Sequence, residues 1–177
     1  KEQFFRLLYT QPEPEIEPGK GFMYCNSDFG LLRLIMEKAS GENLSDWIKK
    51  RIFDRLKMNN TRMQKNAFDI IPNFATKYEI NDTGFKHENI QKTSPGGNYF
   101  ILTCADDLAK WSTAISDPIS EFNAAFNILL QNVRMIPGKK NHYVTGYSID
   151  TINQNAVIVH EGVNNENYLT RIPSKGI

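Results

Sequence analysis

Residues 18–32 read Pro-Gly-Lys-Gly-Phe-Met-Tyr-Cys-Asn-Ser-Asp-Phe-Gly-Leu-Leu, and this stretch decides the fold that the sequence predicts. Its opening Pro-Gly pair is typical of a turn. A short extended run at 21–24 then leads into a helix that starts near Asn26 or Ser27, either of which can cap the free N–H groups of the first turn. Taken alone, the Tyr-x-Asn sequence of Tyr24 and Asn26 fits a packed tyrosine followed by a helix cap.

The residues before and after this stretch predict a largely helical region. Residues 2–9 form a short amphipathic helix by their apolar spacing. The helix that begins near Asn26 carries apolar side chains almost all round, so we expect it to be buried on most sides. It is expected to stop at Gly41, because glycine adopts the left-handed capping conformation. Asn43 is the predicted cap of the next helix.

Two more helices are predicted after a long irregular connection at 59–98. Connections of this length in compact domains are often functional. The first of the two helices starts at Thr103, with Asp106 three residues later in the manner of a capping box. The second starts at Asp117-Pro118, where proline is favoured in a first turn.

The C-terminal part changes to strand patterns. Strands are predicted at Tyr143–Asp150, Ala156–His160 and Tyr168–Ile172, with a polar turn at 153–155 between the first two. The order predicts an α+β fold, with 1–138 mainly helical and 139–177 forming a small antiparallel sheet. Because three strands with an apolar face need a covering layer, we also expect a missing piece of the fold.

Composition excludes several classes of function. The formal net charge is +1, so no general attraction to nucleic acid or to an anionic membrane is implied. No stretch is long and apolar enough to span a bilayer. The three histidines have no metal-ligand spacing, and no phosphate loop or dinucleotide fingerprint is present, so we expect no metal and no cofactor. Cys25 and Cys104 are interpreted as free thiols rather than a bridge.

Four motifs in order carry a resemblance to a known family. The stretch at 18–32 resembles the Pro-Gly-x-x-Phe-x-Tyr-Ser-Asn-x-x-Tyr-x-Leu-Leu signature of serine β-lactamase-like proteins, which include class C β-lactamases, D-alanyl-D-alanine carboxypeptidases and esterases. Residues 52–61 are similar to the family's Ile-x-x-Pro-Leu-Gly-Met-x-x-Thr stretch. Gly96-Gly97 with Ala105-Asp-Asp-Leu108 is similar to its Gly-Gly-x-x-Ser-Thr-Ala-x-Asp-Leu run. His160-Glu-Gly162 resembles the His-x-Gly form of its Lys-Thr-Gly motif.

The resemblance implies the β-lactamase/transpeptidase-like fold and acyl transfer through a serine ester. Tyr24 is then expected to be the proton shuttle, and Asn26 to hold the substrate carbonyl and the lysine of the family's Ser-x-x-Lys motif. His160 is expected to face a substrate carboxylate or the tyrosine, and Gly162 to let the substrate lie along the strand edge. The backbone N–H of Val163 is expected to be one oxyanion donor. The implied substrate is a β-lactam, a D-amino-acid peptide or an ester.

The sequence departs from this family in one decisive respect. No serine in it has a lysine three residues later, so the Ser-x-x-Lys nucleophile is absent. We therefore expect a C-terminal part of such a domain, lacking its N-terminal half and inactive alone. The alternative is a non-catalytic binding or interaction module of the same fold. Bacterial relatives usually work outside the cytoplasm, which implies the periplasm or cell envelope. Cys25 is a packed thiol or, as an alternative, a redox target.

Overall fold

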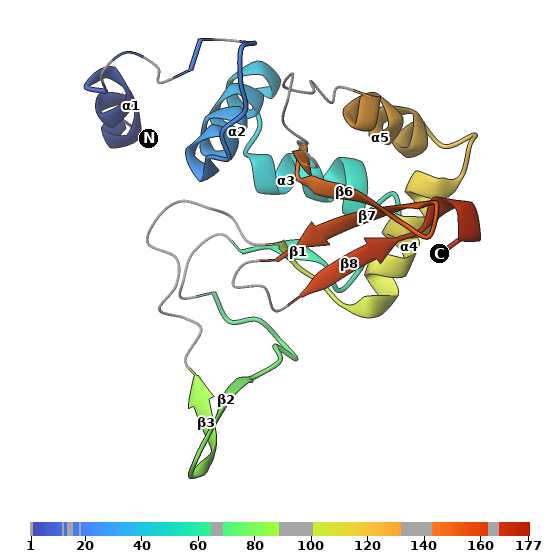
Figure 1. The fold of residues 1–177 in the computed structure, drawn as a ribbon. Helices are drawn as coiled ribbons and strands as arrows, with labels where there is room; N and C mark the ends of the chain where they lie inside the picture. Colours follow the sequence, from blue (N-terminus) through green and yellow to red (C-terminus); the bar gives the residue numbers. More distant parts are fainter. Residues whose placement is uncertain are drawn as a thin grey trace. The chain divides into compact units, whose positions relative to one another are not determined.

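The computed structural model describes residues 2–11, 13, 16–17, 19–64, 69–88, 101–131, 143–162 and 167–177. They fall into two compact units. Unit 1 comprises residues 1–24 and 127–177, and unit 2 comprises residues 25–126. The predicted boundary between 138 and 139 lies outside the described residues and stays a prediction. The predicted α+β class is confirmed, because helices and antiparallel strands are both present (Figure 1).

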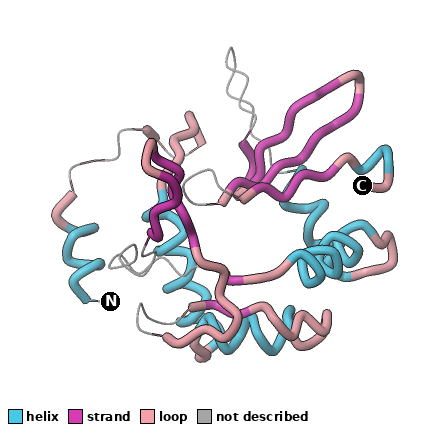
Figure 2. Tube along the Cα trace, turned by 90° about the horizontal axis from the view of Figure 1, so that it is seen from below, coloured by secondary structure: helices cyan, strands magenta, loops and turns pink. Residues whose placement is uncertain are grey.

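Unit 1 contains helix α1 (Glu2–Tyr9), as predicted, and a four-stranded antiparallel sheet. The strands follow one another in the order β5 (Tyr143–Val144), β6 (Tyr147–Ile152), β7 (Asn155–Glu161) and β8 (Tyr168–Arg171). A 3-10 turn, η4 (Pro173–Lys175), follows the sheet, and Ser174 Oγ donates to Asn155 Oδ1 at 2.6 Å. Figure 2 shows the long β6–β7 hairpin with the C-terminal turn beside it.

Two tight turns shape this sheet. The turn at Asn153 and Gln154 (φ 49° and 65°) was predicted, and it pairs Ile152 with Asn155. The prediction of one strand over Tyr143–Asp150 is wrong, because Thr145 and Gly146 (φ 41° and 94°) form a second turn. Two consecutive positive φ angles match the twist of a two-residue hairpin, so the predicted strand folds back on itself as β5 and β6.

Unit 2 begins with three consecutive helical segments. They are α2 (Asn26–Ser40), α3 (Leu44–Ile48) and the π-helical η1 (Lys49–Phe53). Gly41 ends α2 at φ 71° and donates its N–H to the Glu37 carbonyl, as predicted. Asn43 caps α3, as predicted, by accepting the Ser45 N–H at 3.0 Å. The N-cap of α2 is Cys25, not Asn26 or Ser27, and no side-chain hydrogen bond is made there.

The apolar face of α2 differs from the prediction. We expected the helix to be buried on most sides, but several of its large apolar side chains are exposed, among them Ile35 at 54% and Leu32 at 50%. Apolar spacing predicts which face of a helix is suited to burial, but it does not identify the surface that covers this face.

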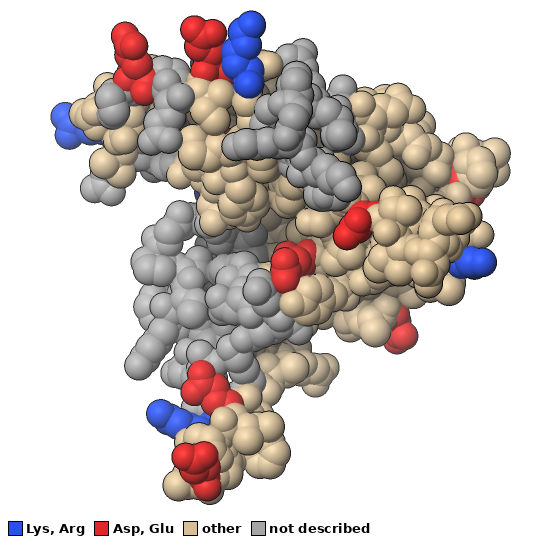
Figure 3. All heavy atoms as spheres, viewed as in Figure 1, with Lys and Arg blue, Asp and Glu red and all other residues tan. Residues whose placement is uncertain are grey.

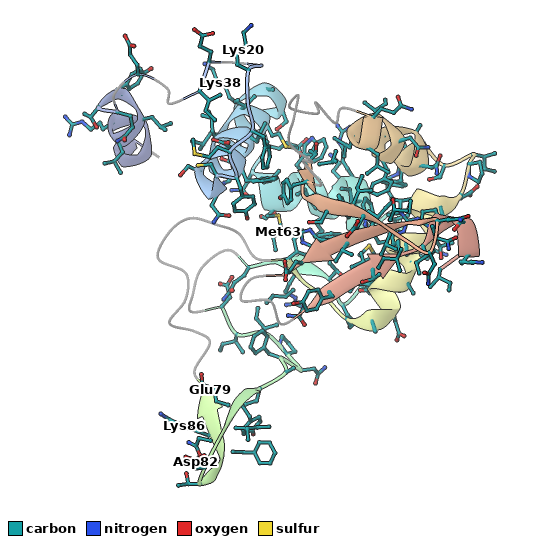
Figure 4. The ribbon with its side chains drawn as sticks, viewed as in Figure 1. Lys20, Lys38, Met63, Glu79, Asp82 and Lys86 are labelled. Carbon is teal, nitrogen blue, oxygen red and sulfur yellow. The ribbon has the colours of Figure 1, made fainter. Side chains whose placement is uncertain are left out.

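The long connection of unit 2 contains two strand pairs that the sequence did not predict. β1 (Arg62–Met63) pairs with β4 (Ile101–Leu102) and so brings the two ends of the connection together. β2 (Lys77–Asn81) and β3 (Gly84–Glu88) form a hairpin between them. In this hairpin, Glu79 and Lys86 are register partners on neighbouring strands (Figure 4).

Helix α4 (Ala105–Ser116) begins at Ala105 with Cys104 as its N-cap, two residues later than the predicted start at Thr103, and no side-chain hydrogen bond caps it. The second acid of its first turn is the important one. Asp107 is fully buried, and its Oδ2 accepts the Asn60 N–H at 2.8 Å and the Thr61 hydroxyl at 2.9 Å. Its Oδ1 accepts from Lys110 Nζ at 2.7 Å. Burial alone would raise the pKa of Asp107, but these hydrogen bonds outweigh it and lower the pKa.

Helix α5 (Glu121–Gln131) starts later than predicted, because Asp117 uses its carboxylate to bind the Ile119 N–H in a turn at 3.1 Å. Asn123 Nδ2 donates to the Ile115 carbonyl at 2.8 Å and ties α5 to the end of α4. Among the described residues of unit 2, the buried apolar side chains are Phe53, Met58, Ile115 and Phe126.

Candidate active site

Tyr24 lies in the extended segment 21–25, next to its last residue, and this segment belongs to none of the described strands. Its ring meets the ring of Tyr143 edge-to-face, with 5.4 Å between the centroids and 90° between the planes. Phe22 contacts the same Tyr143 ring at 5.7 Å. Because alternate residues of an extended chain point to one side, both aromatic side chains reach the same partner. The structure therefore attaches the Tyr24 side of unit 1 to strand β5.

Tyr143 is half-buried, and its electrostatic surroundings keep it neutral. Burial is the largest cause that raises the pKa of Tyr143, and the nearby Tyr24 phenol raises it further. A backbone hydrogen bond at Gly146 acts in the opposite direction but does not reverse the shift. A negative charge on Tyr143 is disfavoured beside a second phenol that can itself carry one, which is why the neighbour contributes to the raised pKa of Tyr143.

His160 lies on β7, where the prediction placed it, and its ring is anchored to the β5–β6 turn. Its Nδ1 atom is 2.6 Å from the carbonyl oxygen of Gly146. Tyr147 packs edge-to-face on the imidazole, with 5.7 Å between the ring centroids. Since a carbonyl oxygen only accepts, Nδ1 carries the proton. In a neutral imidazole Nε2 is then an acceptor, and it donates to a carboxylate only when the ring is doubly protonated.

The two residues that follow His160 pair with residues at or next to the start of the next strand. Glu161 is the register partner of Tyr168 and hydrogen-bonds its hydroxyl, which is the main cause that raises the pKa of Tyr168. Gly162 donates its N–H to the Asn167 carbonyl at 2.8 Å, and a Cβ at Gly162 would lie 3.3 Å from that residue's side chain and carbonyl. The structure thus gives a packing reason for glycine here, and the substrate role of Gly162 stays a prediction.

The structure gives less information about the remaining predicted site residues. Asn26 is the first residue of α2 and belongs to unit 2. Val163 and the Gly96-Gly97 pair lie outside the described residues, so the predicted oxyanion donor stays a prediction. Cys25 and Cys104 are both free thiols, in agreement with the sequence interpretation.

Two residues of this arrangement, Tyr143 and Gly146, were not selected from the sequence. Gly146 could have been found, because an isolated glycine is a signal for a turn or a break in a strand. Among the described residues, no cluster of three metal-ligating side chains occurs. No helix in the described part of the chain is long and apolar enough to cross a bilayer. Acidic and basic side chains are scattered over the face in Figure 3, without an area of one sign.

Comparisons with known proteins agree with this geometry at the level of fold and family. The fold matches that of an octameric penicillin-binding protein homologue from Pyrococcus abyssi, with a TM-score of 0.70 and 23% identity, over 91% of this chain and 38% of that one. This defines the fold as that of the β-lactamase and penicillin-binding protein class. The Beta-lactamase family model matches residues 2–141, and the chain belongs to this family.

Two relatives match different shares of the chain. A D-aminopeptidase from Brucella canis is 24% identical over 168 residues, which span 91% of this chain and 31% of that protein. A penicillin-binding protein from Bacillus subtilis is 49% identical over 47 residues, or 27% of this chain and 10% of that protein. The matches therefore span about a third or less of these two relatives.

Proposed function

We propose that this chain supplies the tyrosine and strand walls of a serine acyl-transfer hydrolase. The observation that carries the proposal is the shared anchoring of the two wall residues in unit 1. Tyr24 packs on Tyr143, and His160 binds the carbonyl of Gly146, so both attach to one hairpin. Acyl transfer requires its reacting groups to be held in a fixed geometry, and side chains attached to one rigid hairpin meet this requirement.

In the proposed site, Tyr24 moves the proton between nucleophile and leaving group, and Asn26 binds the substrate carbonyl. His160 and Gly162 line the strand side, and the Val163 N–H stabilises the oxyanion. The nucleophile comes from a Ser-x-x-Lys segment outside this sequence. Without it Tyr24 has no hydroxyl to activate, so we expect no turnover by this chain alone.

The family favours a small-molecule or peptide substrate, and we propose a D-amino-acid peptide. The observation that supports this choice over a β-lactam is the D-aminopeptidase match, which extends over 91% of the chain.

The test begins with the open reading frame upstream of residue 1. The protein encoded there together with this chain is assayed with a D-alanine anilide, a chromogenic β-lactam and a short-chain ester. We expect turnover of the anilide that is lost in Tyr24→Phe. Ester or β-lactam turnover alone would reject the peptide substrate.

The same assay on residues 1–177 by themselves tests the expected inactivity. If this chain alone shows turnover that disappears in Tyr24→Phe, the proposal that the nucleophile lies outside this sequence is rejected. A reading frame without Ser-x-x-Lys, together with no turnover of any substrate, would favour the non-catalytic module. The matched control is Tyr78→Phe on the β2–β3 hairpin, which removes a hydroxyl from another half-exposed tyrosine and should leave turnover unchanged.

A further inference from the structure

We propose that Tyr143 is a positioning residue for Tyr24 and holds the Tyr24 phenol in place by an edge-to-face ring contact. The functional part of this inference rests on the proposed role of Tyr24 in proton transfer. The contact itself can be tested without any activity, so the two proposals can fail separately.

Tyr24 is a side chain that gains from support of this kind. It is 56% exposed, and its backbone segment, 21–25, belongs to none of the described strands. An exposed side chain on such a segment keeps several rotamers, and ordering it costs conformational entropy. A proton shuttle must nevertheless stay within hydrogen-bond reach of the groups it serves.

The geometry around Tyr143 supplies the support. The 5.4 Å separation and 90° angle to Tyr24 are the edge-to-face arrangement that aromatic pairs prefer. Phe22 contacts the Tyr143 ring from the same segment at 5.7 Å, so the segment is held at two alternate positions. A rotation of Tyr24 away from Tyr143 would lose this edge-to-face contact.

Tyr143 is itself well fixed. It pairs with Ser148 in the β5–β6 ladder, and the two-residue turn that follows Val144 sets the register. Because burial and the neighbouring Tyr24 both raise the pKa of Tyr143, its hydroxyl stays protonated. Tyr143 therefore supports Tyr24 without competing for its role in proton transfer.

The contact is tested by NMR on residues 1–177 with labelled tyrosine rings, the Tyr24 signals being assigned with Tyr24→Phe. We expect ring–ring cross-peaks between Tyr24 and Tyr143. In Tyr143→Leu the Tyr24 signals should move toward exposed-tyrosine values, whereas Tyr143→Phe should retain their ring-current shift. Tyr78→Leu is the control and should leave them in place. Absent cross-peaks, or unchanged Tyr24 signals in a folded Tyr143→Leu, would overturn the proposal.

The functional part is tested by kinetics on the complete gene product. Because misplacing a reacting group by an ångström costs up to roughly a hundredfold in rate, Tyr143→Leu should lower kcat by about tenfold or more. KM should stay within about twofold, and Tyr143→Phe should restore most of kcat. If Tyr24→Phe abolishes turnover and Tyr143→Leu leaves kcat unchanged, positioning fails alone. If Tyr24→Phe has no effect, the proposed function fails, and the NMR result still decides the contact.

Discussion

The Nδ1 atom of His160 lies 2.6 Å from the carbonyl oxygen of Gly146, and this contact fixes where the imidazole carries its proton. A carbonyl oxygen has no proton to give, so the nitrogen must donate. The other ring nitrogen is left for a ligand, and its character depends on the charge of the ring. A lysine at this position would always be a donor, whereas a neutral His160 is an acceptor.

The first prediction concerns this tautomer. Nitrogen-15 NMR of neutral His160 should show the proton on Nδ1 and none on Nε2, because only that form binds the Gly146 carbonyl. A neutral ring protonated at Nε2 would contradict the structure.

Gly146 itself should be sensitive to substitution. Its φ of 94° disfavours any residue with a Cβ, although a Cβ there would meet nothing within 4 Å. We expect Gly146→Ala to lower the free energy of unfolding by about 1–2 kcal/mol through backbone strain alone. The His160 Nδ1–H signal should then shift or broaden. Gly41→Ala, at φ 71° and with equally open space, is the matched control. It should destabilise the protein similarly while the His160 signal stays unchanged.

Local chemistry made parts of this fold predictable. Gly41 ends α2 and Asn43 caps α3, because each acts on backbone groups only a few residues away. The turn at 153–154 followed from its polar residues in the same way. The family resemblance predicts that Tyr24 and His160 belong to one site, and this stays a prediction. The structure shows that both contact the β5–β6 hairpin.

Features that depend on distant partners were not predictable. Asp106 and Asp107 are adjacent acids in one helical turn, and only Asp107 is buried. Its hydrogen-bond partner Thr61 lies 46 residues away in the sequence, so the local sequence does not show which of the two acids is buried. Tyr143 gave no local signal either, since its significance lies in the contact with Tyr24. The exposed apolar face of α2 was not predictable for a similar reason. The spacing of apolar residues predicts an apolar face, but it does not show whether another part of the protein covers that face.

The pKa of Tyr143 should respond to its neighbour Tyr24. Tyr24→Phe removes one of the two causes that raise the pKa of Tyr143, so that pKa should fall. It should stay above the ordinary value of 10.0, because burial is the larger cause and remains. The measurement is an NMR titration of the Tyr143 ring in both proteins, with Tyr168→Phe as the control that leaves it unchanged. An unshifted Tyr143 in Tyr24→Phe would show that the two phenols do not interact.

Asp107 should be the most sensitive acid of α4. Asp107→Ala leaves the Asn60 N–H and Lys110 without their buried acceptor, whose own side chain has no exposure. We expect a loss of about 2–3 kcal/mol in the free energy of unfolding, discounted because the Lys110 side chain is 41% exposed. Trp111 fluorescence during urea unfolding reports on this helix. Asp106→Ala, its exposed neighbour, should cost less than about 0.5 kcal/mol. Equal losses from the two variants would refute the assignment of the buried cluster to Asp107.

The same carboxylate should make unit 2 sensitive to acid. The pKa of Asp107 is lower in the folded protein than its ordinary value of 3.8, so the unfolded chain binds its proton first as the pH falls. Its contribution to stability is therefore complete well above pH 3.8 and is lost as the pH falls through the lowered native pKa. Asp107→Asn does not titrate, so the stability difference between the wild type and this variant should shrink in that range. Asp106→Asn leaves the buried hydrogen bonds of Asp107 in place, so this control should still lose the stability that depends on Asp107 when that group is protonated. A difference between wild type and Asp107→Asn that stays constant from pH 7 into strong acid would mean that the Asp107 carboxyl has the same pKa in the folded and the unfolded protein, so that the hydrogen bonds from Lys110 and Thr61 do not lower it.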